Sequence, residues 1–181
     1  MDSVAGLYVV HPPMKYFTNR SQLARMDLNT KLIMTYFLVF MLLATALSIL
    51  MAVQRTALQP QAAAEYYRGS DEGMVFPKDP AELMETTHFH IYMMAFVFMT
   101  TGHLFLLSAW NQVSKTIVIS GGFLYILLDV AKPWLIRYVS AGFGVLAPIN
   151  ATLMAVTMLI CIIVPLYELW FLRADQGRTL D

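Results

Sequence analysis

Four apolar stretches, each long enough to cross a lipid bilayer, constrain the fold of this 181-residue chain most strongly. They occupy residues 32–53, 89–110, 117–138 and 149–167. An α-helix rises about 1.5 Å per residue, so about 20 apolar residues cross a hydrocarbon core of about 30 Å. The sequence therefore predicts an all-α integral membrane protein, a bundle of four transmembrane helices.

The charges that flank these stretches predict the topology. Before the first stretch, basic residues outnumber acidic ones, which by the positive-inside rule places that end in the cytoplasm. Four spans then return the carboxyl terminus to the same side. We expect a cytoplasmic segment over residues 1–30, a membrane domain over 31–172 and a cytoplasmic tail over 173–181.

Several classes of function are excluded by what the chain lacks. Its single cysteine, Cys161, rules out an intrachain disulfide, a thiolate zinc site and a covalently attached c-type haem. The formal net charge is +0 and no basic cluster occurs, so a nucleic-acid partner is not expected. No phosphate-binding glycine loop or HExxH motif is present. The sequence thus predicts no catalysis by this chain alone.

The segment between the first two stretches contains glycines and prolines that predict an ordered, turn-rich loop. Asp79 suits an N-cap, Pro80 suits the first helical turn, and Glu82 stands where a capping-box partner belongs. The second helix should therefore begin near Pro80.

Three of the four histidines lie in or beside the second stretch. On a helix, His88 and His90 differ by about 200° and point to opposite sides, whereas His88 and His103 differ by about 60°. Polar or small side chains accompany the latter pair on what we call the histidine face: Glu85, His88, Tyr92, Ala95, Met99, Gly102 and His103. Because lipid does not need such side chains, we expect this face to look into the bundle.

Two imidazoles placed toward opposite leaflets are typical of b-type cytochromes, in which axial histidines hold two haems across the membrane. Gly102 would let a flat macrocycle approach the backbone. The candidate haem-binding residues are His88, His90, Tyr92, Gly102 and His103. Two bis-histidine haems need four histidines, and the other three stretches contain none. The missing ligands would come from a partner subunit, from a homodimer, or from methionines such as Met41, Met51, Met154 and Met158.

Two other interpretations of the histidine face stay open. Glu85 and His88 are three residues apart and, with His103, are candidate metal ligands, for which copper is the natural choice beside methionines. Alternatively, these side chains only anchor the helix at the interface or lock it to partner chains.

The third stretch carries a second polar feature. Asp129 and Lys132 are three residues apart, so their side chains can pair on one helix face. Pro133 has no N–H and leaves the Asp129 carbonyl without its helical donor, which predicts a kinked, polar locus. With Arg137, these residues are candidates for a proton or charge relay, a quinone headgroup site or a counter-charge for a cofactor propionate. A structural ion pair that fixes helix register is the alternative.

The segments YYRGSDEGMVFPKDPAELMETTHFHIYMM, TGHLFLL and LLDVAKPWLIRYVSAGF together resemble a group of small four-span bacterial inner-membrane proteins. The shared pattern is YRG…FPK…ELxExTHxH…GHL followed by D…PWLIRY, over roughly residues 30–172. The resemblance implies a four-helix fold in the bacterial inner (plasma) membrane and no particular reaction. It also implies that certain residues matter in this group: Glu85, Thr87, His88, His90, Gly102, His103, Asp129, Trp134 and Arg137.

These observations predict a membrane subunit of a larger respiratory or energy-converting complex, with other membrane subunits and the lipid bilayer as partners. In the leading hypothesis, the histidine face binds b-type haem for electron transfer. The alternatives are a non-catalytic structural accessory subunit and a membrane copper-binding protein.

Overall fold

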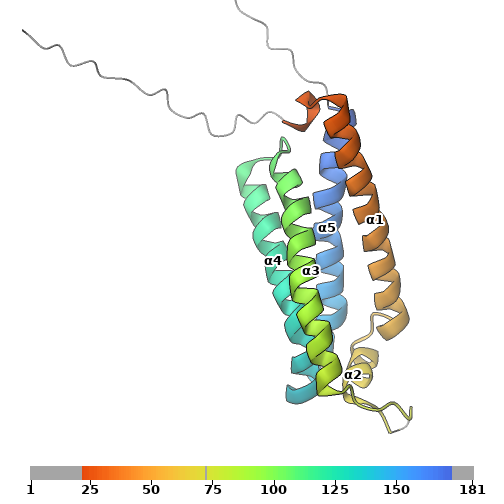
Figure 1. Ribbon diagram of the computed structural model, residues 1–181. Coiled ribbons are helices and arrows are strands. Elements are labelled where there is room, and N and C mark those ends of the chain that lie inside the picture. The colour runs from red at the N-terminus through yellow and green to blue at the C-terminus, as the bar shows by residue number, and fades with distance from the viewer. Residues whose placement is uncertain (1–21, 72, 173–181) are drawn as a thin grey trace, which may run out of the picture.

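The computed structural model describes residues 22–71 and 73–172, which form a helical bundle (Figure 1). Its four long helices are α1 (Leu28–Thr56), α3 (Pro80–Leu106), α4 (Gln112–Trp134) and α5 (Leu146–Trp170). A π-helix, η2 (Leu135–Val139), continues α4, and a 3-10 helix, η3 (Ala141–Val145), leads into α5. The four helical segments are long and apolar enough to cross a membrane, which confirms the predicted all-α, four-span fold.

Some predictions fall outside this description. The predicted tail over 173–181 and most of the predicted segment over 1–30, which contains the fourth histidine, His11, lie beyond the described residues. The helices fit a multi-pass membrane protein. The sidedness of the two ends stays a prediction, so we name the ends by their elements: the α2 end and the opposite end, where the short 3-10 helix η1 (Leu23–Arg25) precedes α1.

Side-chain caps begin three of the spanning helices, and the cap of α4 is Asn111, whose Oδ1 accepts a hydrogen bond from the Ser114 amide at 2.9 Å. The Asp27 carboxylate accepts a hydrogen bond from the Thr30 amide at 3.1 Å, and that of Asp79 accepts one from the Ala81 amide at 2.7 Å. The start of α3 at Pro80 is therefore as predicted. The predicted capping box is wrong, because the Glu82 carboxylate is instead 2.6 Å from the ammonium of Lys78.

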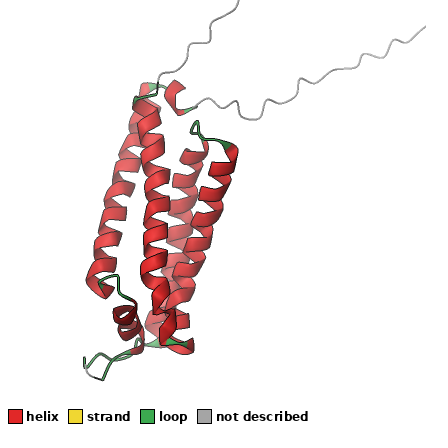
Figure 2. Cartoon of the chain, turned by 180° about the vertical axis from the view of Figure 1, so that it is seen from behind, coloured by secondary structure: helices red, strands yellow, loops and turns green. Residues whose placement is uncertain are grey.

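Helix α5 packs against each of the other three long helices. Figures 1 and 2 show α1 along one side of α5, with α3 and α4 together on the other side. One apolar core joins α1 to α5 around Leu38 and Ile162. A second core joins α3, α4 and α5 around Phe98, Ile126 and Cys161. The two cores use different sides of α5, so this helix connects the bundle.

The predicted ordered loop contains a short helix that the sequence analysis missed, α2 (Pro60–Arg68). After it the chain turns at Gly69, whose φ of +85° favours glycine, and Ser70 pairs with Val75 in an isolated β-bridge. Helix α2 packs against η3 and η2 at one end of the bundle. A Cβ on Gly144 would lie 2.3 Å from the Pro60 carbonyl oxygen, so this glycine permits the close contact of η3 with α2.

Helices α3 and α4 approach each other closely at Gly122, the second of two consecutive glycines in α4. A Cβ on Gly122 would lie 1.9 Å from Cζ of Phe98, which is buried in the second core. A Cβ on Gly121 would meet only ordinary contacts, the nearest being Cε2 of Tyr125 at 3.5 Å. Of these two glycines, Gly122 is therefore the one that the close packing of the helices needs.

We expect Gly122→Ala to lower the free energy of unfolding by about 1–3 kcal/mol, because the added methyl group displaces the Phe98 ring. Gly121→Ala is the matched control, since alanine has a better helix propensity and meets no clash there. Thermal unfolding in detergent micelles, followed by circular dichroism, measures the difference. Equal stability of the two variants would contradict the close contact of Gly122 with the Phe98 ring.

Candidate functional site

The predicted orientation of the histidine face is wrong. Glu85, His88 and His103 are all exposed on the bundle, and the side of α3 that faces inward is a different one. Its buried residues are Leu83, Phe98, Thr101, Gly102 and Phe105. The polar side chains of the histidine face lie toward the ends of the helix. Because α3 is long, these ends reach the membrane interface, where water and headgroups can solvate the side chains.

Two other members of the histidine face also differ from expectation. The ring of Tyr92 is 67% exposed and lies edge-on to His88, with 5.1 Å between ring centroids. Gly102 is buried, but a Cβ there would lie 2.8 Å from Cδ1 of Ile119. Gly102 therefore allows α4 to approach α3, and the room predicted for a macrocycle is occupied by Ile119.

The histidines and methionines that were proposed as ligands lie on different parts of the bundle. The described residues contain no group of three or more His, Cys, Asp or Glu that could hold a metal ion. Met41 packs in the first core, Met154 and Met158 pack in the second, and Met51 is 47% exposed. Haem b and copper therefore stay predictions.

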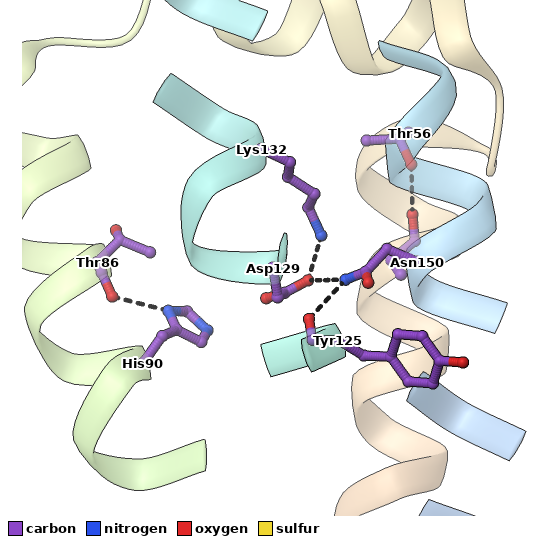
Figure 3. A network of polar contacts seen from close by, with 8 residues as sticks. Thr56, Thr86, His90, Tyr125, Asp129, Lys132 and Asn150 are labelled. Atoms are coloured by element: carbon purple, nitrogen blue, oxygen red, sulfur yellow. Dashed lines mark hydrogen bonds and ion pairs between the residues drawn. The ribbon is translucent and has the colours of Figure 1, made fainter. Parts of the chain in front are cut away.

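His90 is the histidine that lies toward the bundle interior. Its ring Nδ1 is 2.8 Å from the Thr86 carbonyl oxygen. Because a carbonyl only accepts hydrogen bonds, Nδ1 must carry a proton and donate. This leaves Nε2 free, and Figure 3 shows the ring on the side of α3 that faces Asp129 of α4.

Asp129 and Lys132 form the ion pair that their spacing predicts. The side chains are only 19% and 13% exposed, so the pair is largely removed from solvent. Asn150 of α5 joins them: its Nδ2 donates to Oδ1 of Asp129 at 3.2 Å and to the Tyr125 carbonyl at 3.1 Å (Figure 3). We call Asp129, Lys132 and Asn150 the polar cluster.

Asn150 is the member of the cluster that the sequence analysis missed. Asn150 is 2% exposed, and its Oδ1 has no hydrogen-bond partner among the described residues. A buried amide oxygen without a donor costs about 1–3 kcal/mol. The available signal was an asparagine one position into the fourth apolar stretch, where a polar residue needs a buried partner.

Helix α2 packs against η2 and η3 at the same end of the bundle as the polar cluster, and its Tyr67 lies near Asp129. Partial burial, with a smaller contribution from the nearby Asp129 carboxylate, raises the pKa of the Tyr67 phenol to about 12. Beside the cluster, Nε1 of Trp134 donates to Oγ1 of Thr87 at 2.8 Å and ties α4 to α3.

Arg137 lies apart from the relay that the sequence predicts. Its Nε donates to the Lys78 carbonyl at 3.3 Å, so its recorded hydrogen bond leads to the loop before α3. The participation of Arg137 in charge transfer therefore stays a prediction that no contact to Asp129 supports among the described residues.

A second pair of buried charges lies at the opposite end. The Glu168 carboxylate accepts one bifurcated hydrogen bond from the Ala109 amide, with 3.0 and 2.9 Å to its two oxygens. The Lys115 ammonium donates to the carbonyls of Leu106 and Ser108 at 2.7 and 2.6 Å. These contacts close the turn between α3 and α4, since they satisfy backbone groups that the helix ends leave open. The sequence analysis missed this arrangement.

A family model described as a transmembrane helical domain matches residues 57–176. No curated protein matches the chain, and no solved structure does. The matched range contains α2, α3, α4 and α5, and therefore the whole polar cluster.

The raised pKa of Tyr67 predicts a loss of stability in alkaline solution. An unfolded phenol ionises near pH 10, whereas the folded protein holds this proton to about pH 12. Between these two pH values the phenol is ionised in the unfolded state but still protonated in the folded state. The free energy of unfolding therefore falls over this range, by at most about 2–3 kcal/mol.

Unfolding in detergent at pH 9 to 12 tests this prediction, with the wild type compared with Tyr67→Phe. We expect the variant to lose less stability than the wild type over the upper part of that range. Tyr138→Phe, which removes an exposed phenol at the same end, is the control. Identical pH profiles for Tyr67→Phe and the wild type would show that α2 does not bury the phenol.

Proposed function

The chain belongs to the transmembrane helical domain family, and we propose on that premise that it is a membrane subunit of a larger energy-converting complex. In this proposal, the polar cluster handles charge within the membrane domain. The observation that carries it is the largely buried Asp129–Lys132 pair held by Asn150. Ionisable residues inside membrane helices are costly and tend to mark ion or proton paths.

Energetic considerations support a role beyond stability. A buried ion pair is often no more stabilising than apolar side chains of similar volume. Among the described residues, the cluster also keeps one buried acceptor, Oδ1 of Asn150, without a donor. A site that served only to fix helix register would gain from a fully satisfied network.

The charge that we propose for the cluster is a proton. The free Nε2 of a neutral His90 can accept a proton, because Nδ1 already donates to Thr86. The Asp129 carboxylate can accept one also, and Lys132 compensates its charge when it is ionised. Two proton acceptors on facing helices are the minimum that transfer between them requires.

The exposed face of α3 supports the proposal that the chain acts with partner subunits. Glu85 and His88 lie on the outside of the bundle together with Tyr92, which is 67% exposed. Polar side chains on a membrane helix can hydrogen-bond to a neighbouring helix. A non-catalytic structural accessory subunit, which uses the same face only for assembly, is the competing function.

A pair of charge variants separates the two functions. Asp129→Asn leaves Lys132 without its partner and should destabilise the bundle by about 3–5 kcal/mol, whereas Asp129→Asn with Lys132→Met removes both charges and should restore stability. We expect the double variant to assemble with its partner subunits but to lose proton translocation. The measurements are co-purification of a tagged chain from cells that lack the wild type, and acidification of the medium after an oxygen pulse.

Asp71→Asn, which removes an exposed carboxylate at the same end, is the control and should translocate protons as the wild type does. A double variant with full proton translocation would reject charge handling and leave the accessory function. If deletion of the whole chain left proton translocation unchanged, the energy-converting role would be rejected as well.

Haem between two chains is a second candidate, because His88 and His103 are exposed on one helix face where another chain can reach them. It predicts a b-type absorption band in the reduced oligomer or complex that is lost in His103→Gln and His88→Gln. His90→Gln should keep the band, since His90 points to the opposite side of α3. A reduced spectrum without the band in the purified complex would reject this candidate.

A further inference from the structure

Three basic residues from three different segments are linked at the α2 end by hydrogen bonds from arginine side chains to backbone carbonyls. Nη1 of Arg68, at the end of α2, donates to the carbonyls of Ile136 and Arg137 at 3.0 and 3.4 Å. Nε of Arg137, in η2, donates to the Lys78 carbonyl at 3.3 Å. We call Arg68, Lys78 and Arg137 the basic rim.

The positive charge of this rim is only partly compensated. Lys78 pairs with Glu82, and this hydrogen bond raises the pKa of the lysine. Arg137 has no carboxylate at ion-pair distance among residues 22–71 and 73–172, and its terminal nitrogens have no recorded acceptor there. A guanidinium has five N–H donors in a planar fork that matches the oxygens of a phosphate.

Aromatic rings place the rim at the level of the membrane interface. Arg137 lies over the Tyr138 ring at 5.4 Å, and the rings of Trp134 and Tyr138 stack with 5.7 Å between centroids. The Lys78 ammonium lies 4.8 Å from the centroid of Tyr66. Tryptophan and tyrosine are enriched where headgroups begin. Trp134, Arg137 and Tyr138 stand in the last residues of the span that ends at Val139, and Lys78 lies just before the span that begins at Pro80.

We propose that the basic rim binds the phosphate of an anionic lipid headgroup, with Arg137 as the principal donor and Arg68 beside it. The phosphodiester lies in the headgroup layer, at the depth of Trp134 and Tyr138, and its acyl chains extend along the lipid-exposed sides of the helices. The Arg68 contacts to the carbonyls of η2 hold the two guanidinium-bearing segments together. This inference is independent of the proton function proposed for the polar cluster.

The test measures the lipids that remain bound to the full chain. The protein is reconstituted in vesicles of phosphatidylcholine and phosphatidylglycerol in equal amounts and extracted in mild detergent, and bound lipids are counted by native mass spectrometry. The variants are Arg137→Gln, Arg68→Gln and Arg137→Lys, and the control is Arg55→Gln, which removes a basic residue in the last turn of α1. Circular dichroism checks that each variant keeps its helices.

We expect the wild type and Arg55→Gln to retain phosphatidylglycerol in preference to phosphatidylcholine. Arg137→Gln should reduce that preference about tenfold, the effect of losing one charge-assisted hydrogen bond of about 1.5 kcal/mol. Arg68→Gln should reduce it less, and Arg137→Lys should keep part of it, because the charge stays while the fork is lost. A purely structural role for Arg137 would instead change stability without changing the preference.

Three results would overturn the proposal. The first is an unchanged lipid preference in folded Arg137→Gln and Arg68→Gln. The second is an equal loss in Arg55→Gln, which would indicate general attraction between charges. The third is displacement of the bound lipid by inorganic phosphate at millimolar concentration, since a lipid site gains additional affinity from the acyl chains and should resist it.

Discussion

The contact of α5 with α4 is the interaction on which the rest of the structure depends. Helix α5 carries two apolar cores on different sides, one shared with α1 and one shared with α3 and α4. On the same helix, Asn150 reaches across to the Asp129 carboxylate and the Tyr125 carbonyl. If α5 were rotated about its axis, both the second core and the polar cluster would be lost together. The apolar packing of the bundle and the polar cluster therefore both depend on α5.

At the α2 end of the bundle, the short helix α2 packs beside the residues that join α4 to α5. Pro133 leaves one carbonyl of α4 without a donor, and the helix continues as the π-helical turn η2. Arg68 of α2 satisfies two carbonyls of that turn, while Tyr67 of the same short helix lies near Asp129. The irregular backbone after Pro133, the polar cluster and the basic rim are therefore neighbours at one end of the bundle. The opposite end contains buried charges too, but there they close a turn.

Local pairings were predictable because they depend only on spacing along one helix. The Asp129–Lys132 pair and the start of α3 after Asp79 are of this kind. The rotation of α3 was not predictable by the same means, and His90 rather than His88 lies toward the interior. The residues that pack inward, Leu83, Phe98 and Phe105, are no more apolar than Phe89, Ile91 and Phe96, which face outward.

The sequence by itself determined the number of spanning helices, their approximate limits and the polar residues that they contain, because bilayer thickness sets the length of an apolar stretch. The tertiary structure alone decided which side of each helix faces inward, that Asn150 joins Asp129, and that α2 packs at the same end of the bundle. In water, hydrophobicity marks the buried side of a helix. In lipid, the outward and inward sides are equally apolar, so helix rotation depends on close packing and on hydrogen bonds between distant residues.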